Sequence, residues 1–188
     1  MVANNEIFQG YQLYCNIYFV IIIIIIPYKP LKRKQKDKII ISIGIGVISL
    51  IIALAVYLQL ENAKIQAYTE SYGRLVADSR LLTQSYQSEI GKWKSKQYDN
   101  ATMVSITDKY LPKFQSLVDR AGQLQPPEKY AKSRDFSIQS FRSEIESYKH
   151  FRNFLTTGNG AEDIKSTQLL SDALRYESYA FAAFYASH

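Results

Sequence analysis

The residues closest to a metal-site pattern are Glu146 and His150, a carboxylate and an imidazole four positions apart. A di-iron site in a helical bundle requires carboxylates from four helices and two Glu-x-x-His pairs, in which the spacing is three. A spacing of four places both side chains on one face of a helix, where a surface ion pair forms readily. The sequence therefore predicts a Glu146–His150 surface pair, no metal site and no cofactor.

The sequence contains none of the other common catalytic or nucleotide-binding motifs that we looked for. The chain has no Gly-rich phosphate loop, no G-x-S-x-G and no C-x-x-C sequence. Its single cysteine, Cys15, lies within the first thirty residues, so disulfide bonds do not stabilise the rest of the chain. We predict that the protein is not an enzyme.

Asn100 begins the sequence Asn-Ala-Thr, which is an acceptor for N-linked glycan on exported chains. The preceding Asp99 together with Asn100 is also a turn signal and a helix N-cap. Asn100 is therefore either a glycosylation site or only part of a cap.

Residues 39–60 form an uncharged stretch with fourteen Ile, Leu and Val residues. As a helix it would be about 33 Å long, enough to cross a hydrocarbon core of about 30 Å. We expect a transmembrane helix over residues 39–60, because a buried core helix would be shorter and would carry a polar stripe.

The basic segment, residues 31–38, precedes this helix and fixes its expected direction. Basic residues beside a membrane span stay in the cytoplasm, so residues 61–188 are expected on the extracytoplasmic side of the cell membrane. Residues 29–38 carry a net charge of +5 and residues 61–188 only +2. The basic isoelectric point therefore reflects topology, and we expect no nucleic acid as a partner.

Residues 1–30 allow three interpretations. The apolar run 17–26 is short for a span, and Pro27 and Pro30 follow it. The segment is a first span that forms a two-span hairpin with residues 39–60, or it is an interfacial or disordered leader. In the third interpretation it is not part of the natural protein, and translation begins near Leu31. An ordinary signal peptide is not indicated, since a basic start and a small-residue cleavage site are missing.

Residues 61–188 are predicted to be all-α. Helices are expected over residues 61–97 and 101–121, from Pro126 to a stop at residues 158–160, and from Ala161 onwards. Pro112 predicts a kink or short break in the second helix, and Gly122 is its expected C-cap. Short turns between four amphipathic helices predict an up-down-up-down four-helix bundle with the C-terminal residue near the bilayer.

The last helix is apolar on two sides. Its expected core seam consists of Leu170, Leu174, Phe181, Phe184 and Tyr185. A second face offers small residues beside tyrosines, which suits a partner helix, although both faces can also be core. The candidate interaction face consists of Leu169, Tyr176, Tyr179, Ala180 and Ala183.

Three functions are compatible with a membrane-tethered helical domain. The first is a protein-interaction module or accessory subunit that binds another membrane or envelope protein. The second is an extracytoplasmic small-ligand binding or sensor bundle without an output domain of its own, in which some of the ten tyrosines of residues 61–188 line a pocket. The third is a structural protein of the cell envelope.

Overall fold

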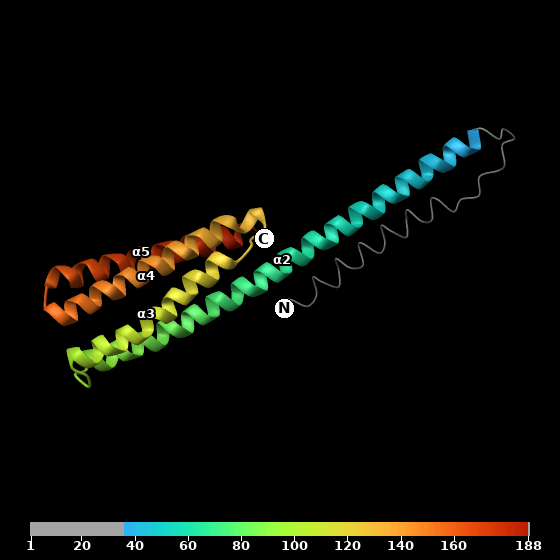
Figure 1. Cartoon of the computed structure of the whole chain (residues 1–188). Coiled ribbons are helices and arrows are strands. Elements are labelled where there is room, and N and C mark those ends of the chain that lie inside the picture. The colour runs from blue at the N-terminus through green and yellow to red at the C-terminus, as the bar shows by residue number, and fades with distance from the viewer. Residues whose placement is uncertain (1–35, 188) are drawn as a thin grey trace. The chain divides into compact units, whose positions relative to one another are not determined.

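The computed structural model describes the backbone of residues 36–187 and the side chains of residues 44–187. This part of the chain is all-helical, with four α-helices, one 3-10 turn and no strand (Figure 1). The chain divides into two compact units, Met1–Ala53 and Leu54–His188, and we call the second the helical unit. The predicted leader, residues 1–30, and most of the basic segment, residues 31–38, lie outside the described residues.

Helix α2 spans Lys36–Lys94 as a single helix, and the boundary between the two units falls within it. It is the one helix in the described part of the chain that is long and apolar enough to cross a membrane. Its large apolar side chains near the N-terminal end are exposed, among them Ile45 at 60% and Leu50 at 70%. Further along, α2 carries the expected apolar seam, in which Tyr72, Leu75 and Tyr86 are buried.

Helix α3 spans Asn100–Gln123 and begins as the sequence predicts. The carboxylate of Asp99 accepts a hydrogen bond of 2.7 Å from the backbone N–H of Thr102. This contact satisfies one of the amide groups that a helix start leaves unpaired.

Of the kink or short break predicted at Pro112, the break is wrong, because α3 continues through this residue. Pro112 and Asp108 are both exposed, so the carbonyl that loses its helical partner is accessible to water. The predicted cap at Gly122 is also wrong. The helix ends at Gln123, and its C-cap is Leu124, which adopts an extended conformation and donates its N–H to the carbonyl of Ala121.

Helix α4 spans Ala131–Thr157 and follows the 3-10 turn η1, Glu128–Tyr130. The predicted third helix is thus confirmed, but its predicted start at Pro126 is wrong, because η1 comes first and α4 begins at Ala131. Gly158 closes α4 in the left-handed region, at φ 72°. Helix α5 spans Gly160–Tyr185, and the side chain of Asn159 caps it by accepting from the N–H of Ala161 at 3.0 Å.

Helices α4 and α5 pack antiparallel through small residues that repeat every seven positions. Ser140 Oγ donates to the carbonyl of Ala173, and Ser147 Oγ donates to the carbonyl of Ser166, each over 2.8 Å. Small side chains let two helices approach closely enough for such side-chain-to-backbone bonds. The buried small residues of this interface are Ser133, Ser140 and Ser147 on α4, with Ser166, Ala173 and Ala180 on α5.

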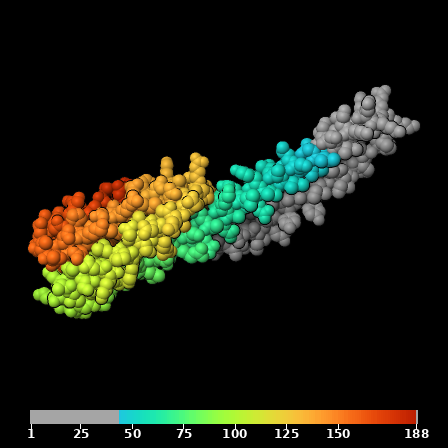
Figure 2. All heavy atoms as spheres, viewed as in Figure 1, coloured from blue at the N-terminus to red at the C-terminus, as the bar shows by residue number. Residues whose placement is uncertain are grey.

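The main core of the helical unit lies between α2, α3 and α4. Its centre is Tyr86, which is fully buried and forms a hydrogen bond of 2.8 Å with Thr107. Its ring contacts those of Tyr148 and Phe114, with centroids 4.5 and 5.9 Å away. Figure 2 shows the atoms of α3 and α4 meeting along their length on the face in view.

A second, smaller core brings together both ends of the helical unit's sequence. Tyr68 and Tyr72 of α2 pack with Tyr130 of η1, and the ring of Phe184 of α5 lies 4.9 Å from that of Tyr72. Ser187 Oγ donates to the carbonyl of Lys129, which holds the end of α5 against η1. The last turn of α5 therefore lies beside the part of α2 that follows residue 65.

Candidate functional site

A groove of about 370 Å³ opens between α2, α4 and α5. Its volume lies within the range of about 300–1,000 Å³ that is usual for small-molecule sites. No tyrosine lines this groove, and five of the ten tyrosines of residues 61–188 are buried in the two cores: Tyr68, Tyr72, Tyr86, Tyr130 and Tyr148. The groove is lined by Ser79, Arg80, Thr83, Gln84, Gln87, Ser140, Phe141, Glu144, Leu170, Ala173, Leu174 and Glu177.

Glu144 is the one acidic side chain that is buried in the described part of the chain, at 7% exposure. Its Oε1 accepts two hydrogen bonds, one of 2.9 Å from Thr83 and one of 2.6 Å from Tyr148. Within the described residues, no donor reaches its Oε2, and the carboxyl group lines the groove. An acid in this position is costly unless it is protonated or paired.

Burial raises the pKa of the Glu144 carboxyl above its ordinary value. The hydrogen bonds from Tyr148 and Thr83 oppose this rise, and the negative charge of Glu177 adds to it. Burial, and then the charge of Glu144, likewise raises the pKa of the Tyr148 phenol. Tyr148 therefore remains a hydrogen-bond donor to Glu144 across the physiological pH range.

Two exposed charges stand at the rim of the groove, Arg80 from α2 and Glu177 from α5. Neither forms an ion pair with another residue of the described part of the chain. The groove thus has an apolar wall, two carboxyl groups and one guanidinium group.

Sequence analysis did not single out Glu144, although a signal was present. The apolar seam of α4 includes Phe141, Ile145 and Tyr148, and Glu144 projects from the same side of the helix at 100° per residue. A charged residue inside an apolar seam is a candidate for a functional group.

The candidate interaction face on α5 is divided by the structure. Ala180 is buried at 3% against α4, so its interpretation as part of a contact surface is wrong. Leu169, Tyr176 and Ala183 are half-buried, and Tyr179 is exposed at 47%. The expected core seam is also wrong at Leu174 and Tyr185, which are both exposed.

An aromatic cluster nevertheless remains on this side of α5. The ring of Phe136 on α4 lies 5.6 Å from that of Tyr179 and 6.5 Å from that of Tyr176. Phe136 and Tyr176 are half-buried and Tyr179 is exposed. The three rings form one surface patch, which we call the aromatic patch.

Asn100 is the first residue of α3 and is exposed. Its Oδ1 accepts a hydrogen bond of 2.9 Å from Nε1 of Trp93, which leaves the amide nitrogen, the atom that carries a glycan, outside this contact. Asp99, and not Asn100, provides the N-cap.

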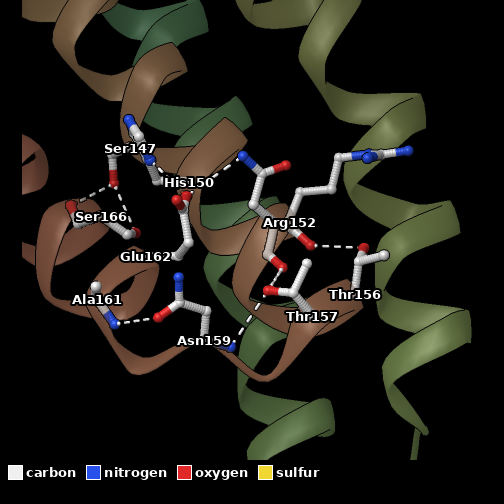
Figure 3. Close-up of polar contacts among 10 residues, drawn as sticks. Ser147, His150, Arg152, Thr156, Thr157, Asn159, Ala161, Glu162 and Ser166 are labelled. Atoms are coloured by element: carbon white, nitrogen blue, oxygen red, sulfur yellow. Dashed lines mark hydrogen bonds and ion pairs between the residues drawn. The ribbon is translucent and has the colours of Figure 1, made fainter.

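The predicted Glu146–His150 pair is wrong. Glu146 binds Lys149 at 2.7 Å, whereas Nδ1 of His150 lies 2.7 Å from Oε2 of Glu162 on α5 (Figure 3). This contact with His150, followed by that with Asn153, lowers the pKa of Glu162. Among the described residues, no group of three or more His, Cys, Asp and Glu side chains is placed to hold a metal ion.

Comparison of the chain with protein-family models, curated proteins and solved structures finds no match.

Proposed function

We propose that the protein is a membrane-anchored module whose helical unit binds another protein, as an accessory subunit of a membrane complex. In this proposal residues 39–60 cross the membrane. Residues 61–188 form an up-down-up-down four-helix bundle on the extracytoplasmic side. The protein acts by binding and is not an enzyme.

The apolar surface of α2 supports the anchor. No residue of its most apolar stretch is buried, and water-exposed apolar area costs about 25 cal/mol per Å². On an insertion scale, the fourteen Ile, Leu and Val residues of 39–60 each contribute about −0.3 to −0.6 kcal/mol. The bilayer is therefore a better environment for this segment than water.

The charges before the anchor support the orientation. Five basic residues precede or open the apolar stretch, and only Asp37 opposes them. Such a cluster stays on the cytoplasmic side. The basic residues are Lys32, Arg33, Lys34, Lys36 and Lys38.

The observation that carries the interaction role is the aromatic patch. Aromatic side chains are the common anchors of protein interfaces, since they bury a large area at a low cost in conformational entropy. Tyr179 is exposed at 47% although it belongs to a ring cluster, so a partner could still cover it. The patch contains two of the residues of the candidate interaction face, Tyr176 and Tyr179.

Cross-linking in native membranes, followed by purification and mass spectrometry, tests this proposal. We expect a stoichiometric partner, and we expect Tyr179→Asp to remove it, because a carboxylate would be buried against the partner. Ser116→Asp on the exposed face of α3 is the matched control and should retain the partner. Recovery of the same partner with folded Tyr179→Asp would show that the aromatic patch is not the contact.

A second candidate function is small-ligand binding, and the groove that contains Glu144 favours it. The groove has the size and the mixed apolar and polar lining of a ligand site. Such a module would capture or sense a solute outside the cytoplasm and would depend on a partner for output.

A further inference from the structure

The groove between α2, α4 and α5 contains a carboxyl group that is only half satisfied. The protein supplies two donors to Oε1 of Glu144 and, within the described residues, none to Oε2. Oε2 is not enclosed by the protein and borders the groove, so a donor that enters the groove can reach it. The free oxygen is therefore the place where a ligand that donates hydrogen bonds would gain most.

The second carboxyl group of the groove increases the preference for positive charge. Glu177 stands at the rim, and its charge is among the influences that raise the pKa of Glu144. Repulsion between the two acids would be relieved by a cation between them. Arg80 is the one cationic residue of the lining, and solvent screens its charge as it screens that of Glu177, because both side chains are exposed.

The apolar wall of the groove indicates that a cationic ligand would also carry an apolar group. Phe141, Leu170 and Leu174 line the groove, and Leu174 is exposed at 57%. An apolar group that covers these side chains would gain about 25 cal/mol per Å² of buried area. A hydrated metal ion would gain nothing from this wall, whereas an organic ammonium ion fits both parts of the groove.

We infer that this groove binds a small organic cation, a protonated amine attached to an apolar body. Its ammonium group donates to Oε2 of Glu144 and lies near Glu177. Its body covers Phe141 and the two leucines. This inference rests on the second candidate function, ligand binding by the helical unit, and is independent of the aromatic patch.

The position of Glu144 within an apolar seam supports the inference. A largely buried acid lowers stability, and groups that do so are typical of functional sites. Two helices hold the carboxyl group in place, because Thr83 of α2 and Tyr148 of α4 both donate hydrogen bonds to it. The site is therefore positioned before a ligand arrives.

Three probes of equal body and different charge test the inference on the full-length chain in detergent micelles. They are n-butylammonium, 1-butanol and pentanoate, which all carry a butyl chain. The readout is the NMR shift of the methyl groups of Leu170 and Leu174, which report on the groove itself and not on the micelle. We expect a saturable shift with n-butylammonium alone.

Substitutions connect this binding to the carboxyl groups. Glu144→Gln retains the acceptor for Thr83 and Tyr148 and removes the charge, and we expect affinity for n-butylammonium to fall about tenfold or more. Glu177→Gln, at an exposed position, should weaken binding less, and Arg80→Gln should strengthen it. Glu146→Gln, at an exposed position on the same helix, is the matched control and should leave affinity unchanged.

The outcomes separate the inference from the function on which it rests. If 1-butanol binds as tightly as n-butylammonium, or if Glu144→Gln and Glu177→Gln both leave affinity unchanged, the cation inference is overturned and the groove remains a ligand site. If none of the three probes gives a saturable shift while circular dichroism shows a folded chain, both the inference and the ligand-binding candidate fail. If Glu144→Gln unfolds the protein, the affinity of Glu177→Gln for n-butylammonium tests the cation inference: weaker binding supports it, and unchanged binding overturns it.

Discussion

Ser140 on α4 donates a hydrogen bond of 2.8 Å to the main-chain carbonyl of Ala173 on α5, and both residues are buried. A side-chain hydroxyl reaches the backbone of a neighbouring helix only where both helices present small residues. Every fully buried residue of α5 is small: Ser166, Ala173 and Ala180. The interface of α4 and α5 is thus built on close approach and not on large apolar side chains.

Ser140→Leu should destabilise the helical unit by about 1–3 kcal/mol, because the larger side chain separates two closely packed helices. Ser140→Ala should cost less, about 0.5–1.5 kcal/mol, because only the hydrogen bond is lost. Urea unfolding followed by the fluorescence of Trp93, the single tryptophan, measures both changes. Ser116→Leu on exposed α3 is the control, expected within about 0.5 kcal/mol of the parent. Equal stability of Ser140→Leu and the parent would contradict the close packing.

Glu144 should make the protein less stable as pH rises. Burial raises its pKa from the ordinary value of 4.5, so the folded chain retains a proton that the unfolded chain has released. Stability therefore falls as pH increases from 4.5 to the raised pKa and does not change further on account of this group. Arg80, Tyr148 and Glu177 are the other titratable groups that line the groove or contact Glu144.

Glu144→Gln should remove this pH dependence. At pH values above the raised pKa of Glu144, the variant should have a higher melting temperature than the parent, whereas near pH 4 the two melting temperatures should be similar. Thermal unfolding across pH 4 to 8 measures the difference between variant and parent. Glu146→Gln, where the carboxylate is exposed, should follow the parent at each pH. A parent whose stability rises over this range relative to Glu144→Gln would show that Glu144 is stabilised as the carboxylate.

Two glycines should respond to alanine with opposite sign. Gly158 has φ at +72°, where a side chain costs about 1–2 kcal/mol, so Gly158→Ala should destabilise the protein. Gly122 is helical and exposed, and nothing lies within 4 Å of an added Cβ, so Gly122→Ala should stabilise it by about 0.5–1 kcal/mol. Urea unfolding of the two variants checks the signs. Destabilisation by Gly122→Ala would restore the cap that the sequence predicted there.

The proposed orientation predicts which positions are accessible from outside intact cells. In a chain with Cys15→Ser, a cysteine introduced by Ser116→Cys should react with a membrane-impermeant maleimide before lysis, because Ser116 is exposed on α3. A cysteine introduced by Lys34→Cys, in the basic segment, should react only after lysis. The reverse pattern would place the helical unit in the cytoplasm and would also exclude glycan on Asn100.

The local signals of the sequence predicted most element boundaries. Asp99 caps α3, and the glycine-asparagine-glycine stop separates α4 from α5, because caps and turns depend on side chains and backbone within a few residues. The amphipathic character of α2, α3 and α4 was also predicted, since each of these helices has one dominant apolar face. The prediction at Gly122 was wrong because a glycine permits a helix to end but does not require it to end. Here the backbone stays helical through Gln123.

The tertiary structure decided which face of α5 is inside. Two apolar faces flank the strip of Ser166, Ala173 and Ala180, and periodicity alone assigns the core to the larger side chains. The strip is buried because serines of α4, at the same spacing of seven, face it and donate to its backbone. The partner of His150 and the burial of Glu144 were decided in the same way, by residues distant in sequence. The sequence alone was enough to predict the helices and the apolar stretch of residues 39–60, which depend on local backbone and hydration energies, whereas the groove arises only when α2, α4 and α5 pack together.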